Sequence, residues 1–192
     1  MSDAGASSAG KPKRADGARN RAQLIAAAKR AISAHGAAVS LDLVAREAGV
    51  SIATLYRNFS SRDALLEEVY KEEVEALIRA AETMLAEHDP ITALREWLQM
   101  FVIFLDTKRG MADALSTLIG GPDDLYTGTH ARLSDPISTL IDKATEVTGR
   151  RLNVKPLDML RALTGIASIR PDPDWKRSAF ALVEVFIGAM AR

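Results

Sequence analysis

The chain has 192 residues, enough for one large or two smaller domains, and its 47% hydrophobic and 26% charged residues are proportions typical of a globular protein. It contains no cysteine, which excludes disulfide bonds and thiolate chemistry. Its 25 basic and 25 acidic residues are unevenly distributed, because residues 1–62 hold 10 Lys or Arg against 4 Asp or Glu, and residues 63–192 hold 15 against 21. A basic first part before an acidic remainder is typical of proteins that place one end against nucleic-acid phosphates.

The first 17 residues are rich in Gly, Ala and Ser, and we expect a disordered basic tail there. Its basic residues Lys11, Lys13 and Arg14 leave two interpretations open. The segment either keeps the protein in solution or forms an arm that reaches DNA phosphates or a minor groove. It has no apolar core of the kind that a signal peptide needs, and the longest strongly apolar run, Met100–Leu105, is too short to span a bilayer. We therefore expect a soluble, cytoplasmic protein.

A first helix is predicted from about Ala18 to His35, where Gly36 ends it. Its apolar residues recur at helical spacing and form one stripe: Leu24, Ile25, Ala28, Ala31 and Ile32.

Two short helices joined by a tight turn are predicted within Ser40–Arg62. Ser40 is a suitable N-cap for the first helix and Ser51 for the second. Gly49 lies between them, where a left-handed residue ends a helix without a Cβ clash. Such a pair is either a helix-turn-helix, whose second helix enters the major groove of DNA, or a helical hairpin in an ordinary bundle.

The same segment closely resembles the DNA-binding domain of TetR-family repressors. The resemblance is carried by AGVS at 48–51, TLYRNF at 54–59 and SRDALL at 61–66, and it extends over about Arg21–Val69. It implies a helix-turn-helix domain at residues 18–62, after the tail at 1–17. An effector-binding and dimerisation domain, also helical, is implied at residues 63–192.

The resemblance also implies the DNA contacts. Ser40 and Arg62 are expected to meet phosphates, and Arg57 a base or a phosphate. The other residues assigned to DNA lie on the second helix of the pair: Ser51, Ile52, Ala53, Thr54, Tyr56 and Asn58. Ile52 or Ala53 can contact a thymine methyl group.

The remainder of the chain is predicted to be helical, since no alternating apolar pattern is long enough for a strand. A long helix should begin at Ser60 or Ser61 and run to about His88, before the break at Pro90. Further helices are predicted at residues 91–107, 111–119, 123–147, 156–169 and 174–191. The helix at 123–147 is expected to break near Gly128 or to begin a fresh turn at Pro136. The fold class is therefore all-α.

Two further sets of site residues follow from the resemblance. A pocket for a mostly apolar effector is implied among large side chains that can equally fill a core: Trp97, Phe101, Phe104, Met111, Tyr126 and His130. The last two helices are expected to pair with their copies across a two-fold axis through Leu163, Ile166, Val183, Phe186 and Met190. The segment TKRGMADAL at 107–115 resembles the SbtR-like subgroup of the family.

No constellation of residues indicates catalysis. The three histidines, His35, His88 and His130, are far apart in sequence and form no metal-binding pair. We expect no enzyme activity, no cofactor and no metal site. The predicted function is a homodimeric, ligand-responsive transcription regulator, most simply a repressor that binds a palindromic operator. The alternatives are an all-helical enzyme or ligand carrier without DNA binding, and a family member controlled by a partner protein.

Overall fold

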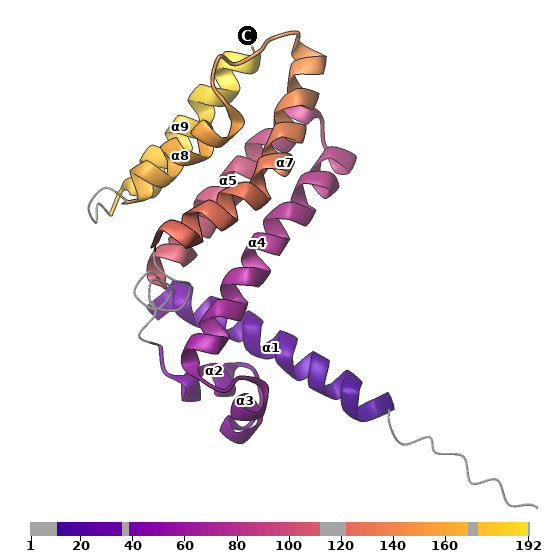
Figure 1. Ribbon diagram of the computed structural model, residues 1–192, viewed down its shortest axis with the longest axis vertical. Coiled ribbons are helices and arrows are strands. Elements are labelled where there is room, and N and C mark those ends of the chain that lie inside the picture. Colours follow the sequence, from indigo (N-terminus) through magenta and orange to yellow (C-terminus); the bar gives the residue numbers. More distant parts are fainter. Residues whose placement is uncertain (1–10, 36–38, 112–121, 169–172, 192) are drawn as a thin grey trace, which may run out of the picture. The chain divides into compact units, whose positions relative to one another are not determined.

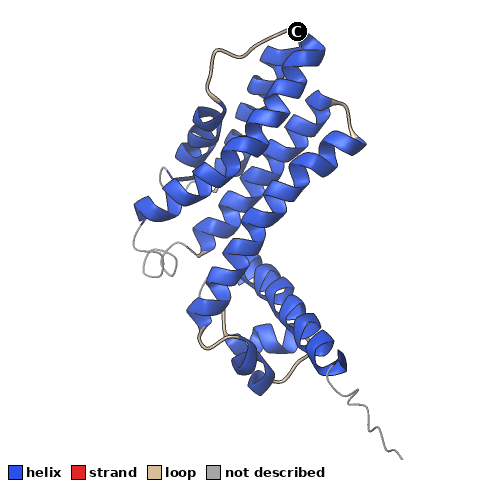
Figure 2. Ribbon diagram, turned by 45° about the vertical axis from the view of Figure 1, so that its right-hand side comes forward, coloured by secondary structure: helices blue, strands red, loops and turns tan. Residues whose placement is uncertain are grey.

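The computed structural model describes residues 11–35, 39–111, 122–168 and 173–191. All regular secondary structure in these ranges is helical, which confirms the predicted all-α class (Figure 2). The chain forms two compact units, Met1–Val69 and Tyr70–Arg192. The boundary between these units lies within a long helix, and Leu65, Leu66 and Val69 at the start of that helix are buried and belong to the first unit.

The first unit contains α1 (Lys11–His35), α2 (Leu41–Glu47), α3 (Ile52–Asn58) and the beginning of α4 (Arg62–Glu87), as labelled in Figure 1. Helix α1 packs against α2 and α3. It buries one stripe: Leu24, Ala27, Ala28, Ala31 and Ile32. This stripe is the predicted one with Ala27 in place of Ile25, which is half-buried.

Helix α1 begins at Lys11, which corrects the expectation of a disordered tail through residue 17. Pro12 lies in the first turn, where its missing N–H costs no hydrogen bond, and several good helix formers follow it. Residues 1–10 of the predicted tail lie outside the described part of the chain.

Side-chain caps and one glycine set the turn between α2 and α3. The Ser40 Oγ accepts a hydrogen bond from the Leu43 N–H at 3.2 Å, and the Ser51 Oγ accepts one from the Thr54 N–H at 3.2 Å. Gly49 has φ 69°, the left-handed conformation predicted for it. Beside it, the Val50 N–H donates to the Ala45 carbonyl at 3.0 Å, in the pattern of a Schellman motif.

The second unit contains the rest of α4 together with α5 (Pro90–Gly110), α7 (Pro122–Thr148), α8 (Pro156–Ser168) and α9 (Trp175–Ala191) (Figure 1). Helix α5 is central, because it packs against α7, α8 and α9. It begins at the N-cap Asp89, whose carboxylate accepts from the Ile91 and Thr92 N–H groups at 3.1 Å. Among the described residues, no helix is long and apolar enough to cross a membrane.

Helix α7 is continuous, although a break near Gly128 or a fresh turn at Pro136 was expected. Pro136 lies inside the helix, and buried neighbours on both sides of it, Leu133 and Ile137, hold the segment against the core. Packing therefore overrides the local cost of the proline. Residues 112–119 of the predicted short helix, which include residues 112–115 of the SbtR-like segment, lie outside the described residues.

Candidate nucleic-acid interface and ligand cavity

Helix α3 has a buried side and an exposed side. Leu55 is fully buried and Phe59, which follows the helix, is 3% exposed. Ala53, Tyr56 and Arg57 are exposed and lie at i, i+3 and i+4, so that they share one face. The Tyr56 side chain is 55% exposed, which is unusual for so large an aromatic residue. This face can contact a partner without any rearrangement of the core.

The serine caps use only part of their hydrogen-bonding capacity. A hydroxyl has one donor and two acceptor positions, and the cap bond at Ser40 uses one acceptor. Its O–H can therefore still be donated to a phosphate oxygen at the exposed N-terminus of α2. The Ser51 hydroxyl has a further contact, because it lies 2.9 Å from the Thr54 hydroxyl.

Thr54 and Asn58 contribute to the internal structure of α3. The Asn58 amide Nδ2 donates to the Thr54 carbonyl at 2.8 Å, and both side chains are half-buried, as is Ile52. Their assignment to DNA stays a prediction, and it requires Asn58 to bind with its amide already engaged within the helix.

Arg21 connects three elements of the first unit. Its Nη1 donates to the Asn58 carbonyl at 3.1 Å, at the end of α3, and its Nη2 lies 2.9 Å from the Glu68 carboxylate on α4. Its guanidinium carbon lies 4.4 Å from the centre of the Phe59 ring. Sequence reasoning did not find this role. The position of Arg21 in the sequence could have indicated it, because Arg21 precedes Leu24 by three residues and so lies on the buried face of α1.

Arg62, the first residue of α4, was predicted to contact a phosphate. Its side chain is half-buried, and Nε and Nη2 are enclosed without a hydrogen-bond partner among the described residues. Buried guanidinium donors without an acceptor are costly, and a phosphate oxygen is a strong acceptor for them.

Four of the six residues predicted to bind a ligand are core residues of the second unit. Trp97, Phe101, Phe104 and Met111 are at most 3% exposed. The Trp97 indole N–H donates to the Leu77 carbonyl at 2.8 Å, and its ring stacks on that of Phe101 at 6.1 Å between centroids. The side chain of Tyr126 lies outside the described part of the structure.

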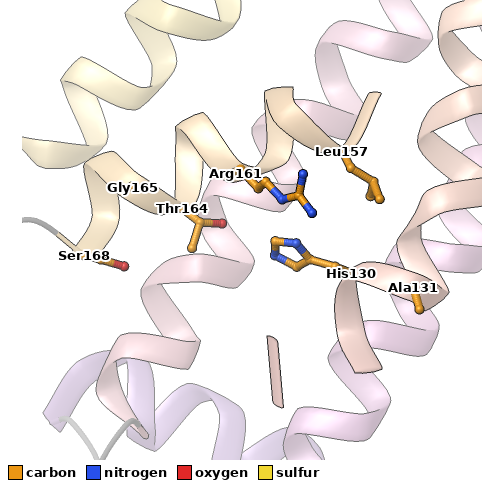
Figure 3. Close-up of a pocket in the computed structure, with 7 residues that line it drawn as sticks. All are labelled: His130, Ala131, Leu157, Arg161, Thr164, Gly165 and Ser168. Carbon is orange, nitrogen blue, oxygen red and sulfur yellow. The ribbon is translucent and has the colours of Figure 1, made fainter. Parts of the chain in front are cut away.

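A cavity of about 600 Å³ lies between α7 and α8 (Figure 3). Its lining residues are His130, Ala131, Leu157, Arg161, Thr164, Gly165 and Ser168. Among the predicted ligand residues whose side chains the structure describes, His130 lines the cavity and the four core residues do not. Figure 3 shows the His130 imidazole and the Arg161 guanidinium pointing toward one another from the two helices.

Positive charges act on His130 at the wall of the cavity. Burial lowers the pKa of His130 below its ordinary 6.5, and the positive charges of Lys108 and Arg161 lower it further. Burial also lowers the pKa of Lys108, on the last turn of α5, from 10.5 to about 8. At pH 7 the Lys108 ammonium is therefore still mostly charged, and the imidazole is neutral. The Arg161 Nη1 donates to Asp158 at 2.7 Å on the same helix.

Comparison with known proteins identifies the family of this chain. Residues 24–69 match the sequence profile of the family described as bacterial regulatory proteins, tetR family. A TetR transcriptional regulator from Streptomyces coelicolor is 36% identical, with 88% of this chain and 97% of that chain covered and a TM-score of 0.76. The chain belongs to the TetR family.

A second similar structure is the TetR transcription regulatory protein from Mycobacterium vanbaalenii, which is 28% identical, with 88% of this chain and 98% of that chain covered and a TM-score of 0.67. No curated protein matches the chain. TetR-family members are DNA-binding transcription factors, and this member is accordingly a transcription regulator and not an enzyme.

The structure changes the interpretation of the dimer face in this TetR-family chain. Leu163, Val183 and Met190 are fully buried by their own chain, because they lie on the sides of α8 and α9 that pack against the core. A partner cannot reach these three side chains without opening that core, so they are corrected to internal packing residues. Ile166 and Phe186 are half-buried and remain accessible.

The exposed face of α9 is small and apolar. Ala181, Val185 and Ala189 are exposed at spacings of four residues, and Val185 is 64% exposed. Together with Glu184, Gly188 and Arg150, they line a hollow of about 540 Å³. Val185 lies about 200° around the helix from the predicted Val183, so only one of the two can face the core.

Proposed function

We propose that this TetR-family regulator is a homodimeric repressor that binds a palindromic operator and releases it when a small molecule occupies the second unit. The observation that carries the proposal is the exposed Ala53, Tyr56 and Arg57 face of α3, on a helix capped and buried on its other side. In a helix-turn-helix protein this second helix contacts base edges in the major groove.

The α3 face supports distinct roles for its residues. Arg57 can donate to guanine O6 and N7 or to a phosphate, and Tyr56 can donate its hydroxyl to a phosphate. Ser40 and Arg62 supply further phosphate contacts at the N-termini of α2 and α4. These contacts would fix the register of α3 on the duplex, while Ala53 and Arg57 would determine the base preference.

Dimerisation is supported by the exposed apolar face of α9. An isologous interface uses the same patch on both copies, and Val185 of α9, with Ala181 and Ala189 on the same face, offers accessible apolar side chains for it. Two copies present two α3 helices, which predicts an inverted repeat with half-sites about one helical turn or more apart.

Release by an effector is supported by the cavity between α7 and α8 and by the continuity of α4, which contributes residues to both units. A ligand that prefers the state unable to bind DNA would change the tilt of α4 and so release the operator. The expected coupling is about 1–3 kcal/mol, or roughly 5- to 150-fold in operator affinity.

The test is selection of genomic DNA fragments by the purified protein, followed by footprinting of the enriched site. We expect an inverted repeat protected on both halves. Tyr56→Ala combined with Arg57→Ala should abolish the footprint and retain the helical circular-dichroism spectrum. Arg30→Ala is the matched control, because it removes an exposed charge from α1 of the same unit. A normal footprint from the double variant would refute the assignment of α3.

A further inference from the structure

Basic side chains from three helices converge near the cavity between α7 and α8. His130 comes from α7 and Arg161 from α8, and both line the cavity. Lys108 comes from the end of α5 and lies close enough to His130 for its charge to act on the imidazole. The charges of Lys108 and Arg161 that act on His130 are both positive, so the surroundings of the imidazole favour an anionic ligand group over a cationic one.

Arg161 has hydrogen-bonding capacity left for a ligand. Its Nη1 donates to the Asp158 carboxylate, which lies three residues earlier on α8. A guanidinium carries five N–H donors in a planar fork, so one bond to Asp158 leaves donors for a second acceptor. Figure 3 shows this fork directed at the His130 ring across the cavity.

The rest of the lining is apolar or small. Leu157 and Ala131 present hydrocarbon, and a Cβ built at Gly165 would meet no atom within 4 Å. A volume of about 600 Å³ lies within the range of small-molecule sites. A molecule that fits both parts of the cavity therefore has an anionic group at one end and a hydrocarbon body at the other.

We propose that the effector is an amphipathic organic carboxylate, whose carboxylate lies between His130 and Arg161 and whose apolar part packs on Leu157 and Ala131. A planar carboxylate matches the guanidinium fork, which favours it over a neutral amide or alcohol of the same shape. This inference rests on the proposed function, because it names the chemical class of the molecule that occupies the second unit.

The experiment compares matched probes on the full-length, DNA-free protein by isothermal titration calorimetry at pH 7. The probes are 4-phenylbutanoate with 4-phenylbutanamide, and hexanoate with hexanamide. We expect each carboxylate to bind about tenfold or more tightly than its amide, since charge-assisted hydrogen bonds are the stronger kind.

Arg161→Gln should remove this preference and leave amide binding unchanged. The Arg161 side chain is 61% exposed, so the substitution is compatible with folding. Arg177→Gln is the matched control, because Arg177 pairs with Asp174 at 2.8 Å with the same three-residue spacing, on α9 and away from the cavity lining. The control should keep the full preference for carboxylates.

A second measurement follows the His130 imidazole by NMR as pH is varied. Among the residues whose side chains the structure describes, the charged groups that act on it are Lys108 on α5 and Arg161 on α8, and Asp158 is the partner of Arg161. A carboxylate bound beside the ring should raise the pKa of His130, whereas the amide should leave it unchanged.

Equal affinity for both members of each probe pair would overturn the inference, as would a carboxylate preference that persists in Arg161→Gln. Neither measurement involves DNA. A protein that binds carboxylates but no operator would refute the proposed function alone. An operator released only by uncharged molecules would refute this inference alone.

Discussion

At the scale of single residues, the structure separates side chains that shape the DNA-binding unit from those that can meet DNA. Arg21 belongs to the first kind, since it contacts the end of α3, the ring of Phe59 and the Glu68 carboxylate on α4. Arg57 and Tyr56 belong to the second, because both are exposed. The two kinds should respond differently to substitution.

Arg21→Gln should lower the free energy of unfolding by about 1–3 kcal/mol, because it removes a charged hydrogen bond and a cation–π contact. Arg21→Lys should recover only part of this loss, since an ammonium cannot make the same forked and stacked contacts. Urea unfolding measures both effects. Arg19→Gln, an exposed residue of α1, is the control, and an equal loss there would contradict the role of Arg21.

Lys108 gives a prediction about pH. Its pKa is about 8 in the folded protein against 10.5 for a free lysine, so the unfolded chain binds more protons between these values. Stability from this group therefore rises with pH between about 8 and 10.5, and the cost of burying the charge is fully present below pH 8.

We expect Lys108→Met to stabilise the protein at pH 7 by at most about 3 kcal/mol, because it replaces a largely buried charge by a hydrocarbon of similar length. The gain over the wild type should shrink as the pH is raised toward 10. Urea unfolding of both proteins at pH 7 and pH 9.5 measures this difference. A gain that is the same at both pH values would show that burial does not control this titration.

At the scale of elements, helix faces decide which residues are available to a partner. Helix α9 buries Ala179, Val183, Ile187 and Met190, and its other side exposes Ala181, Val185 and Ala189. An apolar sequence on both faces is compatible with a second packing surface, but it does not show which face meets the chain's own core.

Val185→Glu should therefore convert the proposed dimer into a monomer, or weaken it by several orders of magnitude, because two carboxylates would be buried against each other at a two-fold interface. Analytical ultracentrifugation measures the change. Val147→Glu on α7 is the matched control, since Val147 is 68% exposed and the substitution is the same. A Val185→Glu protein that remains a folded dimer would place the interface elsewhere.

At the scale of the whole molecule, the proposed function requires coupling between the cavity in the second unit and the DNA face of the first. Gly165 offers a test, because it lines the cavity and a side chain added there meets open space. Gly165→Leu should fill part of the cavity without strain in the helix, which gains helix propensity from the change.

The expected result is a regulator that binds its operator with wild-type affinity and is no longer released by the effector. Electrophoretic mobility shift with and without the effector measures both properties. Gly128→Leu is the control, because this α7 glycine is exposed and equally open. An unchanged effector response in Gly165→Leu would show that the ligand does not use this cavity.

The sequence by itself determined the helical class, the helix-turn-helix and its caps. These features depend on interactions between residues close in sequence. Ser40 and Ser51 cap helices through backbone N–H groups three residues further on, and Gly49 adopts the positive φ of the turn itself. The exposed residues of α3 could also be predicted, because a seven-residue helix with one buried leucine leaves its other face open.

Tertiary structure decided the roles that depend on residues distant in sequence. Periodicity marks Trp97, Val183 and Met190 as apolar, but only packing shows that their own chain buries them. The contacts of Arg21 span up to 47 residues, and the cavity joins His130 to Arg161 across two helices. Such pairings follow from how helices pack, because burial free energy depends on the summed contacts of the whole core and not on any one segment.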